Sequence, residues 1–205
     1  FEQRDDMRKM EMVAGRSINL ALSNRGIMAI KEVGVTDEIL KEAVQMPGRM
    51  LHDKAGNLKF APYGKDETEY INSISRGELN KMLMTAAERF EDVNIHFNQL
   101  VIEVDFDQKI LTLQDADNGA IQTVRGDLII GADGANSAIR QNMEKQIPEY
   151  LSNVDWLEHG YKELTIPAAE GGGFRIERDA LHIWPRGNYM LIALPNFDGS
   201  FTCTL

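Results

Sequence analysis

The sequence has a single cysteine, no long hydrophobic run and too few basic residues to balance its acidic ones. Cys203 has no partner within the chain, which excludes a disulfide framework and favours a reducing compartment. No apolar run approaches the roughly 20 residues that a membrane-spanning helix needs. The net charge of −10 argues against general nucleic-acid binding and against docking on an anionic membrane. We therefore expect a cytoplasmic protein.

The composition is otherwise that of a soluble globular protein. Hydrophobic residues make up 43% of the 205 residues and charged residues 26%, which is enough apolar material for a sizeable core. The sequence starts abruptly at Phe1-Glu2 and stops inside the alternating pattern Phe201–Leu205. We therefore expect an internal piece of a longer protein.

The residues that usually form metal or nucleophile sites are scattered. The four histidines (His52, His96, His159 and His182) show no metal-ligand spacing, and no serine or cysteine lies in a nucleophile motif beside them. The sequence therefore predicts neither a metal site nor a catalytic side chain.

The most informative stretch is Asp127–Arg140. The apolar run Leu128–Ile130 predicts a buried strand, Asp133-Gly134 a sharp turn, and Ser137 the start of a helix that carries Arg140. Such a junction directs backbone N–H groups and the positive end of a helix dipole at an anion. Asp133 then accepts a hydrogen bond from a ribose hydroxyl or, in the alternative interpretation, only caps the helix.

The remaining pattern predicts an α/β chain with a small β-meander. Helices are expected over residues 23–33, 36–44, 76–90 and 137–143, with Ser23 and Thr36 as N-caps. Strands are expected over residues 49–53, 58–61, 70–75, 94–97, 100–106, 110–114, 121–125 and 128–130. A final antiparallel sheet is expected from strands over 161–166, 173–176, 181–184, 189–194 and 201–205. Gly171–Gly173 precedes a predicted strand and not a helix, so we interpret it as a turn and not as a phosphate cradle.

Three segments together resemble the group A flavoprotein hydroxylases: Glu2–Arg4, Ser75–Asn80 and Asp127–Arg140. The resemblance implies a p-hydroxybenzoate-hydroxylase-like fold. Residues 1–155 would form an incomplete, Rossmann-like FAD-binding domain with a substrate-contacting β excursion over about 45–75. Residues 156–205 would begin an antiparallel-sheet substrate domain.

The resemblance also implies FAD and NADPH as cofactors and O2 as co-substrate, so that the flavin carries the chemistry. Glu2 would bind the FAD ribose, Arg76 and Leu79 would start the flavin-side helix, and Asp133-Gly134 would serve both cofactors. Arg140 would close that motif, and Arg4 and Arg8 would assist at the pyrophosphate.

Six further segments resemble the branch of this family that hydroxylates L-kynurenine at ring position 3. They are Gly15–Ser23, Pro47–Met50, Pro62–Gly64, His159–Leu164, Leu181–Pro185 and Ile192–Asn196. This resemblance implies that Arg49 and Tyr63 hold the substrate's carboxylate, as a guanidinium and a phenol are suited to do. It implies an apolar wall around the substrate ring, formed by Ile71, Leu181, Met190 and Ile192.

Other interpretations remain open. Without the resemblance, Arg49 is a surface arginine, Tyr63 a core-edge tyrosine and the apolar residues ordinary sheet core. A different group A hydroxylase, or a non-catalytic protein on the same fold, fits the flavin motifs too. The glycine-rich FAD turn should precede Phe1 and a second glycine–aspartate motif should follow Leu205, so we expect the 205-residue piece alone to hold FAD poorly and to be inactive. The resemblance implies attachment to the mitochondrial outer membrane if the protein is eukaryotic, and only if a C-terminal segment outside this sequence anchors it. The oligomeric state stays open.

Overall fold

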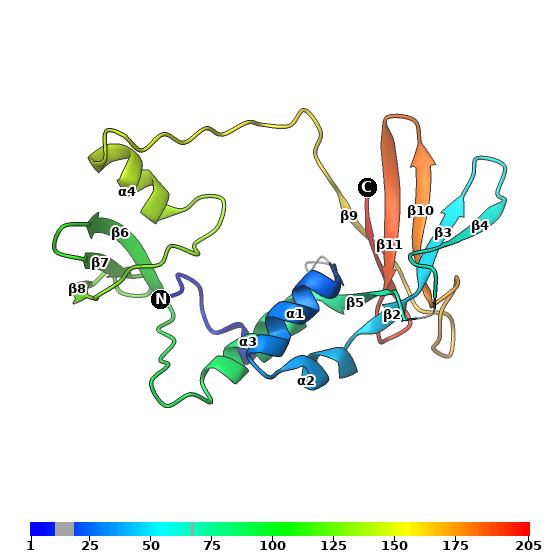
Figure 1. Ribbon diagram of the computed structural model, residues 1–205, viewed down its shortest axis with the longest axis horizontal. Helices are drawn as coiled ribbons and strands as arrows, with labels where there is room; N and C mark the ends of the chain where they lie inside the picture. Colours follow the sequence, from blue (N-terminus) through cyan, green and yellow to red (C-terminus); the bar gives the residue numbers. More distant parts are fainter. Residues whose placement is uncertain (11–18, 67) are drawn as a thin grey trace. The chain divides into compact units, whose positions relative to one another are not determined.

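The computed structural model describes residues 1–10, 19–66 and 68–205, which form two compact units (Figure 1). Unit 1 contains Phe1–Glu11 with Phe90–Glu158, and unit 2 contains Met12–Arg89 with His159–Leu205. The predicted domain division after residue 155 lies near one of these boundaries and stays a prediction. Residues 15–18 of the resembling segment Gly15–Ser23 lie outside the described residues.

Unit 1 is built on an antiparallel sheet in the order β6-β7-β8, as the meander prediction expects. Its elements are the short 3-10 helix η1 (Met7–Lys9), β6 (Gln99–Asp105), β7 (Ile110–Asp115), β8 (Ile121–Arg125) and α4 (Ala138–Gln146). Helix α4 contacts β6, where the Gln146 side chain donates to the carbonyl oxygen of Val104 at 2.7 Å. Val104 and Leu113 are almost completely buried and form the centre of this unit.

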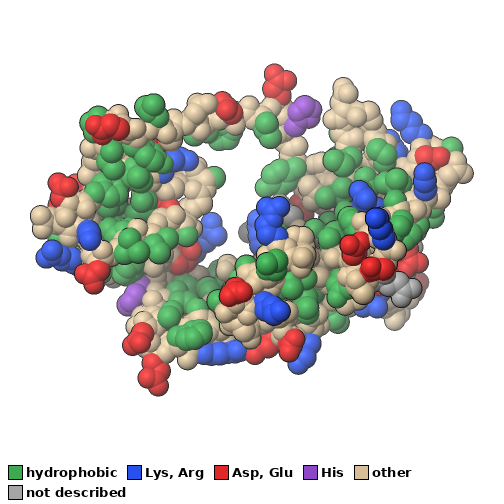
Figure 2. Space-filling model, in the orientation of Figure 1, with side chains coloured by type: hydrophobic (Ala, Val, Ile, Leu, Met, Phe, Trp, Pro, Cys, Tyr) green, Lys and Arg blue, Asp and Glu red, His purple; other side chains and the backbone are tan. Residues whose placement is uncertain are grey.

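The predicted strand over Leu128–Ile130 is wrong. The segment is irregular, and Leu128 and Ile130 are 76% and 80% exposed. A buried parallel strand needs neighbours that cover it, and no described strand pairs with this segment. Figure 2 shows hydrophobic side chains on the visible surface of both units, and these two residues are among the most exposed apolar ones of unit 1.

The predicted strand over 94–97 and the strand end at Phe1-Glu2 are not regular strands either. They nevertheless lie side by side, because the Glu2 N–H donates to the carbonyl oxygen of His96 at 2.8 Å. The Glu2 carbonyl oxygen in turn accepts from the Gln99 N–H at 2.9 Å. This pairing fixes the N-terminal segment beside the start of β6.

Unit 2 contains two sheets and three helices among its described residues. Its elements are β1 (Asn19–Leu22), α1 (Asn24–Glu32), α2 (Thr36–Lys41), β2 (Val44–Met46), β3 (Gly48–His52), β4 (Leu58–Pro62), β5 (Ile71–Ser75), α3 (Arg76–Ala87), β9 (Glu163–Ile166), β10 (Ala180–Arg186), β11 (Tyr189–Pro195) and β12 (Phe201–Thr204). One sheet has the order β1-β5-β2, and the other has the order β4-β3-β10-β11-β12-β9.

The helices pack on the three-stranded sheet around one hydrophobic cluster. Leu22, Ile74 and Leu79 are buried in it, with α1, α2 and α3 contributing the remaining members. Helix α3 starts after Ser75, whose side chain accepts from the Glu78 N–H at 3.4 Å. The N-cap of α2 is Val35 and not Thr36 as predicted; the Thr36 hydroxyl oxygen is buried without a hydrogen-bond partner.

The six-stranded sheet is mixed and not purely antiparallel as predicted. Strand β3 pairs parallel to β10, so the hairpin β3–β4 of the excursion joins the C-terminal strands in one sheet. The predicted strand over 173–176 is wrong: Gly171–Gly173 form a turn with φ of 81° to 91°. Phe174 and Ile176 then pack against the buried cluster of Ala193, Phe201 and Cys203 without pairing in the sheet.

Candidate functional site

A pocket of about 560 Å³ lies within unit 1, between the N-terminal segment, β6 and the irregular stretch before α4. Its lining includes Phe1–Arg4, Gln99–Val101, Leu111, Ile129–Gly134, Asn136, Ala138 and Ile139. Segments far apart in the sequence therefore meet here. Two of the three motifs of the hydroxylase resemblance contribute to this one pocket.

Two glycines of the stretch before α4 line the pocket. Gly134 has a φ of 79°, a conformation that glycine adopts without steric cost. A Cβ atom on Gly131 would lie only 3.0 Å from the side chain of Ile139, so a larger residue would displace the stretch from α4. Gly131 therefore lets the stretch pack against α4, and Gly134 leaves open space beside the backbone.

Asp133 serves as a helix cap at this site. Its carboxylate accepts a hydrogen bond from the Ile139 N–H at 3.2 Å, while Ser137 caps the same helix through the Arg140 N–H at 2.9 Å. Partial burial raises the pKa of Asp133, but hydrogen bonds from the Ser137 side chain and from backbone N–H groups outweigh burial and hold the pKa below its ordinary value. The carboxylate is thus charged at neutral pH and retains acceptor capacity.

We expect Asp133→Ala to lower the free energy of unfolding by about 1 kcal/mol, the usual cost of losing a capping oxygen. Urea denaturation of the full protein measures this change. Asp133→Asn keeps a capping oxygen, so an equal loss in both variants would show that capping is not the cause.

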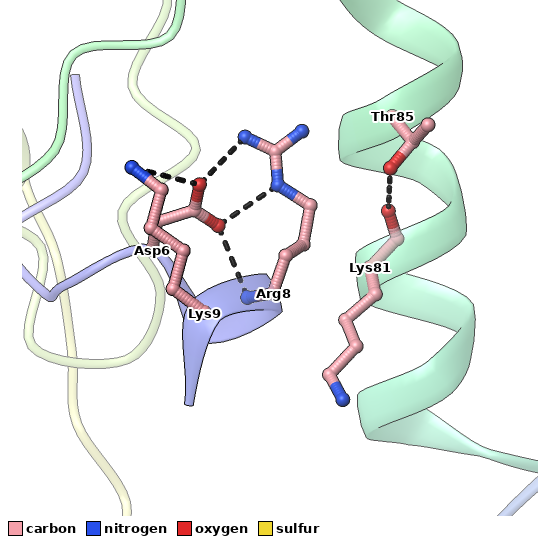
Figure 3. Close-up of polar contacts among 5 residues, drawn as sticks. All are labelled: Asp6, Arg8, Lys9, Lys81 and Thr85. Carbon is pink, nitrogen blue, oxygen red and sulfur yellow. Dashed lines mark hydrogen bonds and ion pairs between the residues drawn. The ribbon is translucent and has the colours of Figure 1, made fainter. Parts of the chain in front are cut away.

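Four of the predicted cofactor residues line the pocket: Glu2, Arg4, Asp133 and Gly134. Arg140 does not; its Nε lies 3.4 Å from the Glu144 carboxylate. Arg8 forms a bidentate ion pair with Asp6 at 2.8 Å, with Lys9 nearby (Figure 3). An arginine in such a pair is less available to a pyrophosphate than Arg4.

The other two predicted cofactor residues belong to unit 2. Arg76 is exposed at the first turn of α3, and Leu79 is buried in the hydrophobic cluster of that unit. Leu79 therefore anchors the helix start through packing. Their predicted role at the flavin stays a prediction.

Arg49 and Tyr63, predicted as the carboxylate clamp, lie together in unit 2. The Arg49 guanidinium carbon is 4.8 Å from the centroid of the Tyr63 ring, a cation–π contact. The hairpin explains the contact: Arg49 is opposite Ala61 in the ladder, and the Tyr63 N–H donates to the carbonyl oxygen of Pro47 at 3.0 Å. Side chains two residues apart in a strand share a face, so Tyr63 is on the face of Arg49.

The Arg49 guanidinium and the Tyr63 hydroxyl can both donate hydrogen bonds to a ligand. The Arg49 Nε is buried and has no hydrogen-bond partner, an arrangement that costs free energy unless an acceptor is bound. Burial raises the pKa of Tyr63, although the Arg49 charge opposes this, so the phenol keeps its proton at neutral pH. The pair thus offers N–H and O–H donors, which is the chemistry a carboxylate requires.

The strand registers place three of the four predicted wall residues on the face of Arg49. Leu181 is paired with Arg49 across β3 and β10, and Ile192 and Met190 are paired with Ile183 and Pro185 of β10. We call this side of the six-stranded sheet the clamp face. Ile71 lies in the three-stranded sheet opposite Met46 and is not brought to this face by any register.

Two sets of residues escaped the sequence-based prediction. Gln99, Leu100, Val101 and Leu111 line the unit 1 pocket, and nothing in an alternating strand pattern distinguishes pocket positions from solvated ones. His52 and His182, interpreted as scattered, touch each other: His52 Nε2 is 2.8 Å from His182 Nδ1. Among residues 1–10, 19–66 and 68–205, no group of three metal-ligating side chains is found. In the same residues, no helix has the length and hydropathy required to cross a bilayer.

Comparisons with known proteins show which sequences and folds the chain is similar to. Residues 8–174 match the family described as "FAD binding domain". The chain is 52% identical over all its 205 residues to the kynurenine 3-monooxygenase of Myxococcus xanthus and 42% identical to that of Sus scrofa, covering 44% and 43% of those proteins. It thus spans less than half the length of these relatives.

Solved structures of low sequence identity share the fold. The flavin-dependent monooxygenase PieE in complex with FAD and substrate matches 95% of this chain with a TM-score of 0.70 at 15% identity, over 36% of its own length. The 2-methyl-3-hydroxypyridine-5-carboxylic acid oxygenase matches 99% of this chain with a TM-score of 0.65 at 16% identity, over 50% of its own length. The predicted α/β fold class of flavin monooxygenases is therefore confirmed.

Proposed function

Because this chain belongs to the FAD-binding domain family, we propose that it is the central part of an FAD- and NADPH-dependent monooxygenase that hydroxylates L-kynurenine at ring position 3. The names of the most similar relatives support this reaction. The single observation that carries the substrate assignment is the Arg49–Tyr63 pair on the clamp face. The Arg49 Nε is buried without a hydrogen-bond partner, and a guanidinium nitrogen in that state is suited to bind an acid group of the substrate.

In this proposal the protein binds and orients, and the flavin supplies the oxygen-transfer chemistry when FAD, NADPH and O2 are bound. Arg49 and Tyr63 fix the amino-acid end of L-kynurenine. Leu181 and Ile192 provide apolar contact for the aromatic ring and exclude water from it. Orientation by a carboxylate grip presents one ring carbon to the cofactor, which accounts for hydroxylation at a single position.

The unit 1 pocket supports the cofactor part of the proposal. The Glu2 carboxylate and the charged Asp133 are acceptors suited to ribose hydroxyl groups, and Arg4 is a cation suited to a phosphate. The open space beside Gly134 permits close approach of a flat or extended ligand. These residues therefore fit FAD.

The deciding experiment measures NADPH oxidation and product formation by the full-length protein, with and without L-kynurenine. The matched control is kynuramine, which has the same aminobenzoyl ring and no carboxylate. We expect flavin absorbance in the purified protein, 3-hydroxykynurenine as product and a much higher KM for kynuramine. Equal KM values for the two compounds would contradict the carboxylate assignment.

We also expect Glu2→Gln to weaken FAD binding by about 10- to 100-fold in the full-length protein, because a charged acceptor for hydroxyl donors becomes neutral. Flavin fluorescence titration of the apoprotein measures the dissociation constant. Asp5→Asn, a neighbouring acid that does not line the pocket, serves as the control. An equal loss in both variants would indicate a general charge effect and contradict the ribose contact.

A different group A hydroxylase is the second candidate function. The solved structures that share the fold carry names of several distinct substrates, so the fold alone does not select one. Activity with another aromatic acid and none with L-kynurenine would favour it. A non-catalytic protein on the same fold would show no flavin absorbance. The predicted cytoplasmic location stays a prediction.

A further inference from the structure

The side of the six-stranded sheet opposite the clamp face carries a stack of aromatic rings, and we call this side the rear face. The His52 ring lies on the Trp184 ring, with centroids 4.1 Å apart and planes 22° apart. His182 is only 1% exposed, and the edge of its ring meets Phe201 at a centroid distance of 5.5 Å. His52 and His182 are joined directly by a 2.8 Å contact between ring nitrogens.

The partners of His182 determine which nitrogen holds its proton. Its Nε2 is 2.6 Å from the carbonyl oxygen of Glu177, and a carbonyl oxygen only accepts, so Nε2 donates. In a neutral ring Nδ1 is then the acceptor, and the His52 Nε2–H donates to it. A second proton on His182 would occupy Nδ1, and a neutral His52 could then accept at Nε2 as its other tautomer. When both rings are protonated, two N–H groups face each other and the hydrogen bond is lost. The contact therefore requires that no more than one of the two rings is protonated.

This contact joins the two strands that position Arg49. Arg49 is paired with Leu181 across β3 and β10, and His52 and His182 follow on the same two strands with their side chains on the rear face. Strand β3 has only the hairpin strand β4 on its other side. The histidine pair is thus a side-chain link between β3 and β10 on the rear face, with His182 next to Leu181 and His52 three residues after Arg49.

We propose that His52 and His182 are positioning residues for Arg49. Their hydrogen bond fixes the position of β3 relative to β10. This places the Arg49 guanidinium over Tyr63 with its donors directed to the substrate carboxylate. The inference rests on the proposed function and adds a residue pair that acts through Arg49.

Burial opposes protonation of the pair, and the charged groups around it act in both directions. Arg186 donates from Nη1 to the carbonyl oxygen of His52 at 3.0 Å, and it reaches the carbonyl oxygen of Asp53 at 3.4 Å. Glu177 contributes the acidic neighbour of His182, and Cys203 on β12 is a buried thiol on the same face. Burial lowers the pKa of both histidines from the ordinary value of 6.5, and the Glu177 attraction only partly offsets this for His182.

The sign of the pH effect follows from these lowered pKa values. Below pH 6.5 the unfolded chain binds protons that the folded pair resists, so the stabilising contribution is complete above pH 6.5 and is lost as the pH falls from there. We therefore expect the KM for L-kynurenine to rise on acidification from about pH 7.5 to about 5.5, with kcat at saturation changed less than KM.

Two variants of His52 in the full-length protein test the proposal. The glutamine side chain in H52Q keeps an amide donor that does not titrate and whose oxygen accepts from protonated His182, so H52Q should retain the wild-type KM at neutral pH and flatten its rise at low pH. The phenylalanine side chain in H52F keeps the ring stack on Trp184 without a donor, so H52F should raise the KM for L-kynurenine by about 3- to 10-fold at both pH values. Unchanged KM in H52F, or an unchanged pH profile in H52Q, would overturn the proposal.

Kynuramine separates this inference from the proposed function. If the wild-type protein does not prefer L-kynurenine to kynuramine, the proposed function fails; if wild type and H52F show the same preference, only the positioning role fails. Amide hydrogen exchange of the peptide containing residues 48–52 measures, without substrate, how firmly β3 is held against β10. We expect faster exchange, after correction for the intrinsic rate, in H52F at neutral pH and in the wild type at acidic pH, and equal protection throughout would overturn the proposal.

Discussion

Arg49→Ala should raise the KM for L-kynurenine by about 30-fold or more, because truncating one partner of a buried charged pair with a ligand costs about 2–5 kcal/mol. The Arg49 Nε is already buried and the guanidinium is held by its contact with the Tyr63 ring, so little binding energy is spent on ordering the side chain. The KM for kynuramine should change little, since that compound has no carboxylate to lose contact with. Steady-state kinetics of the full-length protein at neutral pH measure both constants.

Lys59→Ala is the matched control for Arg49→Ala. Lys59 is an exposed cation of β4, two positions from Ala61, which is the ladder partner of Arg49. Lys59→Ala changes the net charge by the same amount as Arg49→Ala and leaves the Arg49–Tyr63 pair intact. Arg49→Lys should recover only part of the affinity, because an ammonium group lacks the two parallel donors of a guanidinium. Equal KM values for wild type and Arg49→Ala would remove Arg49 from the site.

Stability should respond differently from binding at this position. The Arg49 Nε is buried without a partner, so its desolvation opposes folding when no ligand is present. Removing the side chain relieves that cost while losing the contact with Tyr63. A buried polar group without a partner is typical of a binding site, where the ligand supplies the missing hydrogen bond.

Elements set by local rules were predictable from the sequence, and elements that depend on distant neighbours were not. The apolar period of residues 76–90 gave the helix α3, and the turn residues around Gly56 gave the hairpin β3–β4. The same hairpin register brings Arg49 and Tyr63 together. Their role, however, came only from resemblance to a family, because an arginine on a half-buried strand has no intrinsic signature.

The failures share one physical cause. Leu128–Ile130 and Phe174–Ile176 are short apolar runs, and such runs meet the pattern of a strand whether or not a partner strand is present. Whether they pair depends on what lies beside them in space. The contact between His52 and His182 also depends on the parallel pairing of β3 with β10, which joins residues 130 positions apart. No local pattern encodes that pairing.

Phe201→Ala should lower the free energy of unfolding by about 3–5 kcal/mol, the range for deleting a fully buried aromatic ring. Phe201 is 0% exposed, and its ring meets Phe174 and His182 edge-on at centroid distances of 5.7 and 5.5 Å. Urea denaturation at neutral pH measures the change. Phe197→Ala is the control, since Phe197 lies in the same β11–β12 hairpin but is 60% exposed, and its loss should change stability by no more than about 0.5 kcal/mol.

The cavity left by Phe201→Ala should also alter the behaviour of His182. Burial keeps the pKa of His182 low, so water entering beside the ring would raise that pKa toward its ordinary value of 6.5. The link between β3 and β10 would then be lost at a higher pH than in the wild type, and the acid-induced rise in KM for L-kynurenine would begin closer to neutrality. If the pH at which KM begins to rise is unchanged despite a loss of about 3–5 kcal/mol in stability, packing on the rear face does not control the position of Arg49 on the clamp face.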